Sequence, residues 1–121
     1  LIEGYSEDLS LRERFRTLWL NLLHYCVHHP HEIAFMEQFD NSPYMSAELK
    51  NASAEYYEPL LRFFQHAFQE GVFKEMPWEM VGTYTVDVTI SLAKRHASGQ
   101  LTLDDEAKEL AMSASWDALK L

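Results

Sequence analysis

The stretch PWEMVGTYTVDVTISLAKRHASG, residues 77–99, decides the fold class because its pattern fits two kinds of secondary structure. Between residues 84 and 91, apolar and polar side chains alternate, which is the pattern of a half-buried strand. Val81, Val88 and Leu92 also recur at the spacing of one face of a helix. The alternation alone therefore leaves both interpretations open.

The two ends of this stretch favour a helix. Pro77 suits the first helical position, where its missing amide hydrogen costs nothing, and Ser98-Gly99 suits a helix end. A single strand among helices would leave its backbone amide and carbonyl groups without hydrogen-bond partners. We therefore predict a helix over residues 77–97, and with it an all-α fold.

Helices are also predicted on both sides of this stretch. A long helix runs over residues 46–70, with Pro59 inside it as a kink or a division and Gly71 as the left-handed residue that closes it. A last helix opens at Thr102 and runs to about residue 119, with Asp105 in a variant of the capping box. The apolar residues of both follow the spacing of a helix with one buried face.

The N-terminal part of the chain predicts a central helix. Ser10 and Glu13 fit the S-x-x-E capping box, in which each side chain satisfies a backbone amide of the other residue. The residues that follow are apolar nearly all round, which is typical of a helix that other helices surround. It should end near His29, because Pro30 disfavours helical geometry in the preceding residue and can itself open a short helix. We expect about five helices in one orthogonal or antiparallel bundle.

Length and charge exclude several classes of protein. The 121 residues suit one domain with one core. Ten basic residues against nineteen acidic ones give a formal charge of −9, so this segment lacks the positive charge that binds DNA phosphates or an anionic membrane. No stretch approaches the roughly 20 apolar residues of a membrane span, and no signal segment opens the chain. We expect a cytoplasmic protein without a membrane partner.

Five short passages carry a resemblance to a known family. In chain order they are HP at 29–30, FQEGVFK at 68–74, PW at 77–78, SGQLT at 98–102 and WDAL at 116–119. Their order and spacing, over about residues 10–119, resemble the C-terminal region of bacterial TetR-type (tetracycline-repressor-like) transcriptional regulators. The chain begins at Leu1 rather than Met, which suggests a fragment.

The resemblance implies a domain organisation and a function. Residues 1–9 would be the tail of a linking helix, and residues 10–121 the ligand-binding and dimerisation domain. The family's N-terminal helix-turn-helix has no counterpart here, so operator DNA is expected as a partner only through a missing N-terminal domain. The expected function is small-molecule binding, in a homodimer, coupled to release of operator DNA.

A mainly aromatic set of side chains is the candidate ligand site. Binding pockets are mostly apolar, with a few polar groups that orient the ligand, and the expected effector is small and apolar or aromatic. The candidates are Phe15, Trp19, Leu22, Phe39, Tyr57, Phe64, Phe68, Trp78, Tyr84 and Asp87. Plain core packing is the alternative for each of them.

Small residues on the last two helices form the candidate dimer interface. Small side chains let two helices approach closely, and the resemblance implies that these helices pair with their copies across a two-fold axis. The candidates are Gly82, Thr85, Thr89, Ala93, Ala107, Ala111, Ala114 and Ala118. The alternative is close packing inside one subunit.

Metal binding and catalysis have little support. His24 and His28 are four residues apart on a helix, but no pattern supplies a third or fourth metal ligand. The single cysteine, Cys26, excludes an internal disulfide and is expected to be a buried, inert thiol. No nucleophile motif, phosphate-binding glycine loop or dinucleotide fingerprint is present. We therefore predict no cofactor, no metal and no enzyme activity. A ligand-free helical interaction domain and a histidine-based metal bundle are the alternative functions.

Overall fold

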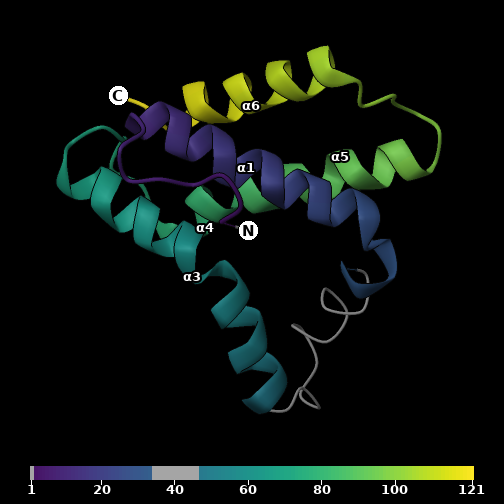
Figure 1. The fold of residues 1–121 in the computed structure, drawn as a ribbon, viewed down its shortest axis with the longest axis horizontal. Coiled ribbons are helices and arrows are strands. Elements are labelled where there is room, and N and C mark those ends of the chain that lie inside the picture. Colours follow the sequence, from purple (N-terminus) through teal and green to yellow (C-terminus); the bar gives the residue numbers. More distant parts are fainter. Residues whose placement is uncertain (1, 34–46) are drawn as a thin grey trace.

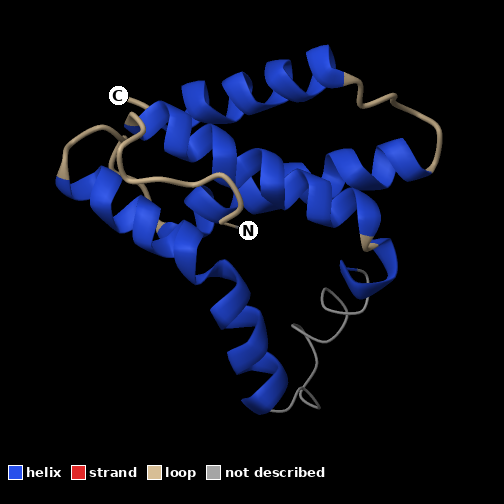
Figure 2. Ribbon diagram, viewed as in Figure 1, coloured by secondary structure: helices blue, strands red, loops and turns tan. Residues whose placement is uncertain are grey.

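A computed structural model describes residues 2–33 and 47–121, with only the backbone described for residues 47–57. Its helices are α1 (Leu11–His28), α3 (Ala47–Gln69), α4 (Trp78–Gly82), α5 (Val88–Ala97) and α6 (Asp105–Leu119), with a π-helical turn, η1 (Thr83–Asp87), between α4 and α5. Figures 1 and 2 show helices joined by loops, and no strand element occurs in the described ranges. The predicted all-α fold is confirmed.

Helix α1 is the centre of the bundle. As predicted, Ser10 caps it: the Ser10 hydroxyl accepts a hydrogen bond from the backbone amide of Glu13 at 3.2 Å. Helices α3, α5 and α6 all contact α1 (Figure 1). The backbone is helical again over residues 30–33, so the prediction that Pro30 opens a further helix is confirmed for its first turn. The buried side chains of α1 are Phe15, Leu18, Trp19, Leu22, Leu23 and Cys26.

Helix α3 bends partway along its length (Figure 1), as expected for a helix with Pro59 inside it. Its C-terminus is closed by Gly71, whose φ of 69° is left-handed. The Val72 amide donates to the Ala67 carbonyl oxygen at 3.0 Å, and the Gly71 amide donates to the Phe68 carbonyl oxygen at 3.1 Å. These two hydrogen bonds are those of a Schellman motif, so the predicted helix end is confirmed.

The deciding stretch is helical from residue 78 to residue 97, which confirms the choice of helix over strand. The π-helical turn within it was not predicted. Here the hydroxyls of Thr83 and Thr85 donate to the carbonyl oxygens of Glu79 and Val81, at 2.8 and 2.6 Å. Such bonds to the preceding turn, in a run of β-branched residues with low helix propensity, favour a local departure from α-helical geometry.

The start of the last helix differs from the prediction. Helix α6 begins at Asp105, and its cap is Asp104, whose carboxylate accepts a hydrogen bond from the Ala107 amide at 2.8 Å. The predicted start at Thr102 is wrong because the next residue, Leu103, is buried in the core and its backbone amide donates to His96 Nδ1 at 3.2 Å. The predicted end near Leu119 is confirmed.

Residues 2–9, here called the N-terminal strap, form turns where the tail of a linking helix was expected. Asn21 on α1 donates its side-chain amide to the Glu3 carbonyl oxygen at 2.8 Å. Arg14, two helical turns earlier on the same face of α1, donates Nε to the Leu9 carbonyl oxygen at 2.9 Å and Nη2 to the Glu7 carbonyl oxygen. The strap is therefore fastened to α1 through its own backbone. The division between residues 1–9 and 10–121 stays a prediction.

Candidate functional site

Part of the predicted ligand set lies in the packed core. Phe15, Trp19, Leu22 and Phe64 are all buried. The ring of Phe15 lies 5.4 Å from that of Trp116, in contact range for aromatic packing. The alternative of plain core packing describes these four side chains, and a ligand contact for them stays a prediction.

Two other predicted residues come together at the surface. The rings of Phe68 and Trp78 meet edge to face at 5.5 Å, and Trp78 is 48% exposed. They line a shallow groove of about 550 Å³ with Gln65, Gln69, Glu75 and Met76. This groove is open to solvent rather than enclosed.

The remaining predicted residues do not join either group. Tyr84 and Asp87 are exposed, because Val81 and Thr85 occupy the buried face of their helix. Phe39 lies outside the described residues, and so does the side chain of Tyr57. The described members of the set are therefore divided among core, groove and surface, and they do not converge on one cavity.

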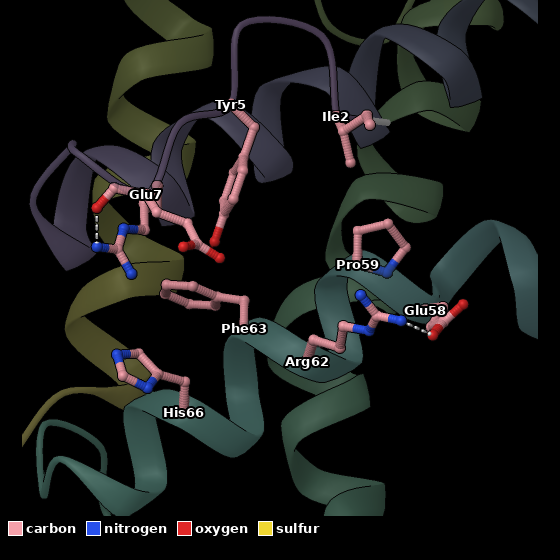
Figure 3. A pocket seen from close by; sticks show the side chains of 9 residues that line it. Ile2, Tyr5, Glu7, Glu58, Pro59, Arg62, Phe63 and His66 are labelled. Carbon is pink, nitrogen blue, oxygen red and sulfur yellow. Dashed lines mark hydrogen bonds and ion pairs between the residues drawn. The ribbon is translucent and has the colours of Figure 1, made fainter.

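A cleft of about 530 Å³ lies between the N-terminal strap and α3 (Figure 3). Here Pro59 and the adjoining turn of α3 form one wall, and the strap forms the other. The lining residues are Ile2, Tyr5, Glu7, Arg14, Glu58, Pro59, Arg62, Phe63 and His66. Sequence analysis missed all of them as site residues. The only signal was Pro59 at mid-helix, which indicates a bend and not a ligand.

The cleft combines an apolar floor with charged walls. Phe63 forms the floor and is held by the core, since it is only 2% exposed. Arg62 pairs with the carboxylate of Glu58 at 2.6 Å. In Figure 3, the Glu7 carboxylate and the Tyr5 hydroxyl lie close together above the ring of Phe63. The arrangement offers the ring of Tyr5, apolar carbon and ionic groups to one small molecule, and no Ser, Thr, Cys or Lys is among the lining residues.

Part of the predicted dimer set is buried inside the subunit. Thr85, Thr89 and Ala93 are buried within the subunit, and Thr89 Oγ1 lies 3.9 Å from Cys26 Sγ on α1. These three residues therefore pack helix against helix inside one chain, and a contact with a second copy stays a prediction for them. Partial or full exposure remains at Gly82, Ala107, Ala111, Ala114 and Ala118.

The rings of His24 and His28 lie against each other on α1, at an angle of 33°. The rings of His24 and His28 lie 4.1 Å apart, and His28 Nδ1 lies 2.9 Å from the His24 carbonyl oxygen. Within the described residues, no three His, Cys, Asp or Glu side chains are placed to hold one metal ion. Cys26 is buried, as predicted.

Across the described part of the chain, no helix combines the length and the apolar character that crossing a membrane requires.

The arrangement of helices defines the class of protein. A TetR family transcription regulator from Marinobacter aquaeolei shares the fold with a TM-score of 0.84 and 26% identity, over 98% of this chain and 62% of that one. A putative TetR family transcriptional regulator from Vibrio parahaemolyticus has a TM-score of 0.72 and 30% identity, over 98% of this chain and 62% of that one. A TetR-family regulator from Haemophilus influenzae has a TM-score of 0.73 and 19% identity. This similarity shows a shared fold and nothing more. The class is a helical domain of transcription regulators.

The family follows from the sequence itself. Residues 10–120 match the family described as "Tetracyclin repressor-like, C-terminal domain". The chain belongs to this family, which confirms the resemblance carried by the five sequence passages. None of the curated proteins matches the chain. The chain spans 62% of the length of each of these three solved structures.

Proposed function

We propose that this chain is the effector-binding and dimerisation domain of a cytoplasmic TetR-type transcription regulator, in which small-molecule binding releases operator DNA. Family membership and the similarity to solved regulators support this function. Because the chain spans 62% of those regulators, we assign DNA binding to a helix-turn-helix domain elsewhere in the complete protein. The formal charge of −9 agrees with that division, since DNA binding needs basic residues.

Dimerisation is assigned to the outer face of α6 together with α4 and η1. Leu110 on α6 is 71% exposed, and Ala114, one helical turn later, is exposed too. Met80 and Tyr84 add exposed apolar surface on the neighbouring helical run. Apolar side chains exposed on small-residue helices favour pairing with an identical face across a two-fold axis.

The effector site is assigned to the cleft beside the N-terminal strap. The observation that carries this assignment is that one cavity is lined both by the strap and by α3 (Figure 3). The strap leads to the end of the chain from which a DNA-binding domain would extend. A ligand in the cleft would therefore contact the connection to that domain directly.

Coupling between effector binding and DNA binding then requires only that the strap has two arrangements. Effector binding favours the arrangement in which the strap and α3 close on the ligand, and operator DNA favours the other. Each ligand shifts the equilibrium by its difference in affinity for the two arrangements. The hydrogen bonds from Asn21 and Arg14 to the strap backbone hold the ligand-competent arrangement.

Light scattering of Leu110→Glu tests the dimer. The wild-type domain is expected to be a dimer at tens of micromolar, and the variant a monomer, because a buried unpaired carboxylate opposes association. Leu61→Glu is the matched control, since Leu61 is also exposed but lies on α3. A wild-type monomer, or equal effects of the two variants, would contradict the assigned face.

Regulation is tested with the protein made from the complete source gene. Fluorescence anisotropy should show binding to DNA flanking the gene, and a ligand that raises the melting temperature should release it. A ligand-free interaction domain is the second candidate function, favoured by the dense packing around Phe15 and Trp19. Dimerisation without any ligand-induced thermal shift or DNA release would support that second function instead.

A further inference from the structure

The charges that line the cleft are not equivalent. Arg62 is paired with Glu58, and Arg14 directs Nε and Nη2 to backbone carbonyl oxygens of the strap. Within the described part of the chain, the carboxylate of Glu7 alone among these four groups makes no hydrogen bond or ion pair. The cleft therefore holds one negative group whose partner is open to a ligand.

Aromatic rings flank this carboxylate. Figure 3 shows Tyr5 and Phe63 on two sides of the space beside Glu7. The Phe63 ring is held in place by Phe15 and Phe73, with ring centroids 6.1 and 5.9 Å away. An organic ammonium group is attracted both to aromatic faces and to a carboxylate, and the two attractions add when the groups adjoin.

The charge of the whole chain acts in the same direction. A formal charge of −9 raises the local concentration of cations and lowers that of anions. An anionic ligand would meet this field and the Glu7 carboxylate together, and the guanidinium of Arg14, which is held on strap carbonyl oxygens, is the opposing charge in the cleft. A neutral ligand would gain only from the apolar floor.

We propose that the cleft binds an organic cation, with its ammonium group beside Glu7 and Tyr5 and its apolar body over Ile2 and Pro59. The volume of about 530 Å³ is in the range of small-molecule sites. This inference rests on the proposed function, because it names the ligand class of the effector site. It also makes Glu7 and Tyr5 the link between ligand and strap.

Isothermal titration of the domain with benzyltrimethylammonium tests the proposal. Benzoate is the matched anion, and benzyl alcohol is the neutral aromatic. We expect measurable binding of the cation alone, weakening as salt is raised from 50 to 500 mM, because the attraction is partly ionic. Equal binding of benzoate or benzyl alcohol, or no binding of the cation, would overturn it.

Two variants locate the binding. Glu7→Gln is expected to weaken cation binding about tenfold, which is the loss of one partly exposed charge contact. Asp8→Asn is the control, since it makes the same change of net charge one residue away and does not line the cleft. Tyr5→Leu should weaken binding by several-fold through loss of its ring, with an unchanged circular dichroism spectrum. Equal effects of Glu7→Gln and Asp8→Asn would contradict the site.

The two proposals fail in different ways. If the cation does not bind but another class of ligand releases DNA from the complete protein, the ligand class is wrong and the regulatory function stands. If the cation binds as described but leaves DNA affinity unchanged, the site is correct and the coupling is wrong.

Discussion

Two regions of the molecule meet at Phe63 and differ in what they leave exposed. On one side, Phe63 packs with Phe15 and Phe73 in a core that also holds Trp116. On the other side, it forms the floor of the cleft, beside the Glu7 carboxylate, which has no partner among the described residues. The core packs its aromatic side chains against one another, whereas the cleft leaves Tyr5 partly exposed and Glu7 exposed. Stability is therefore expected to depend on the first region and ligand binding on the second.

The largest expected effect is a difference in stability between variants of two tryptophans, Trp116 and Trp78. Trp116→Ala should lower the free energy of unfolding by about 3–5 kcal/mol, because Trp116 is buried against Phe15 and Phe73. Trp78→Ala should cost about 1 kcal/mol, since the side chain is half exposed at the groove. Urea denaturation measures both. Similar losses would show that the aromatic core does not dominate stability.

A second test concerns the turn that brings Phe73 to the core. Gly71→Ala should destabilise by about 1–2 kcal/mol, because residue 71 is left-handed, although a Cβ atom there meets nothing within 4 Å. Gly82→Ala is the control, as this glycine is helical and equally unobstructed. It should stabilise by about 0.5–1 kcal/mol. The account fails here if the two changes have the same sign.

A smaller effect tests the start of α6, which supplies Trp116. Asp104→Ala should cost about 1 kcal/mol through loss of the cap, whereas Thr102→Ala should change stability by less than about 0.5 kcal/mol. Thermal denaturation is sufficient to rank them. A larger loss for Thr102→Ala would restore the predicted capping box.

The ion pair between Arg16 and Glu109, at the edge of the core, should make stability depend on pH. The hydrogen bond from Arg16 lowers the pKa of Glu109 below its ordinary value of 4.5. A carboxyl with a lowered folded-state pKa stabilises the fold above its unfolded pKa, and that contribution is lost as pH falls through the folded value. Both side chains are about two-fifths exposed, so the effect should be small. The free energy of unfolding of wild type should fall as pH drops below 4.5, and Glu109→Gln should make that fall smaller. The same slope of unfolding free energy against pH in both proteins would contradict the pairing.

The smallest effect on stability is expected in the cleft. Glu7→Gln should change the free energy of unfolding by less than about 0.5 kcal/mol, because the carboxylate is exposed and without a partner in the described residues. Urea denaturation beside the binding titration separates the two properties. A loss above 1 kcal/mol would mean that Glu7 supports the fold, and the two regions would not be distinct.

The sequence predicted the helices well where local chemistry defines them. Ser10, Pro30 and Gly71 act through hydrogen bonds or dihedral limits within a few residues, so their roles are visible in the chain itself. Thr102 was misassigned because burial of Leu103, a tertiary effect, overrides its capping potential. The π-helical turn also escaped prediction, since threonine hydroxyls bond to backbone only once a helix is formed.

The site was predicted less well for a physical reason. Aromatic residues such as Phe15 and Trp19 look alike in sequence whether they surround a ligand or one another. The cleft depends on the strap folding back along α1 by the bonds from Arg14 and Asn21 to backbone oxygens. No residue spacing encodes such a contact between side chain and distant backbone.

The most direct test of the coupling is to measure ligand affinity in the complete protein with and without bound promoter DNA. Reciprocity requires that DNA weaken ligand binding by the same factor by which the ligand weakens DNA binding. We expect that DNA weakens benzyltrimethylammonium binding by the same factor by which benzyltrimethylammonium weakens DNA binding. This factor should be above about 5 in wild type and fall toward 1 in Glu7→Gln. Ligand affinity that is the same with and without DNA would contradict the assignment of this cleft as the effector site.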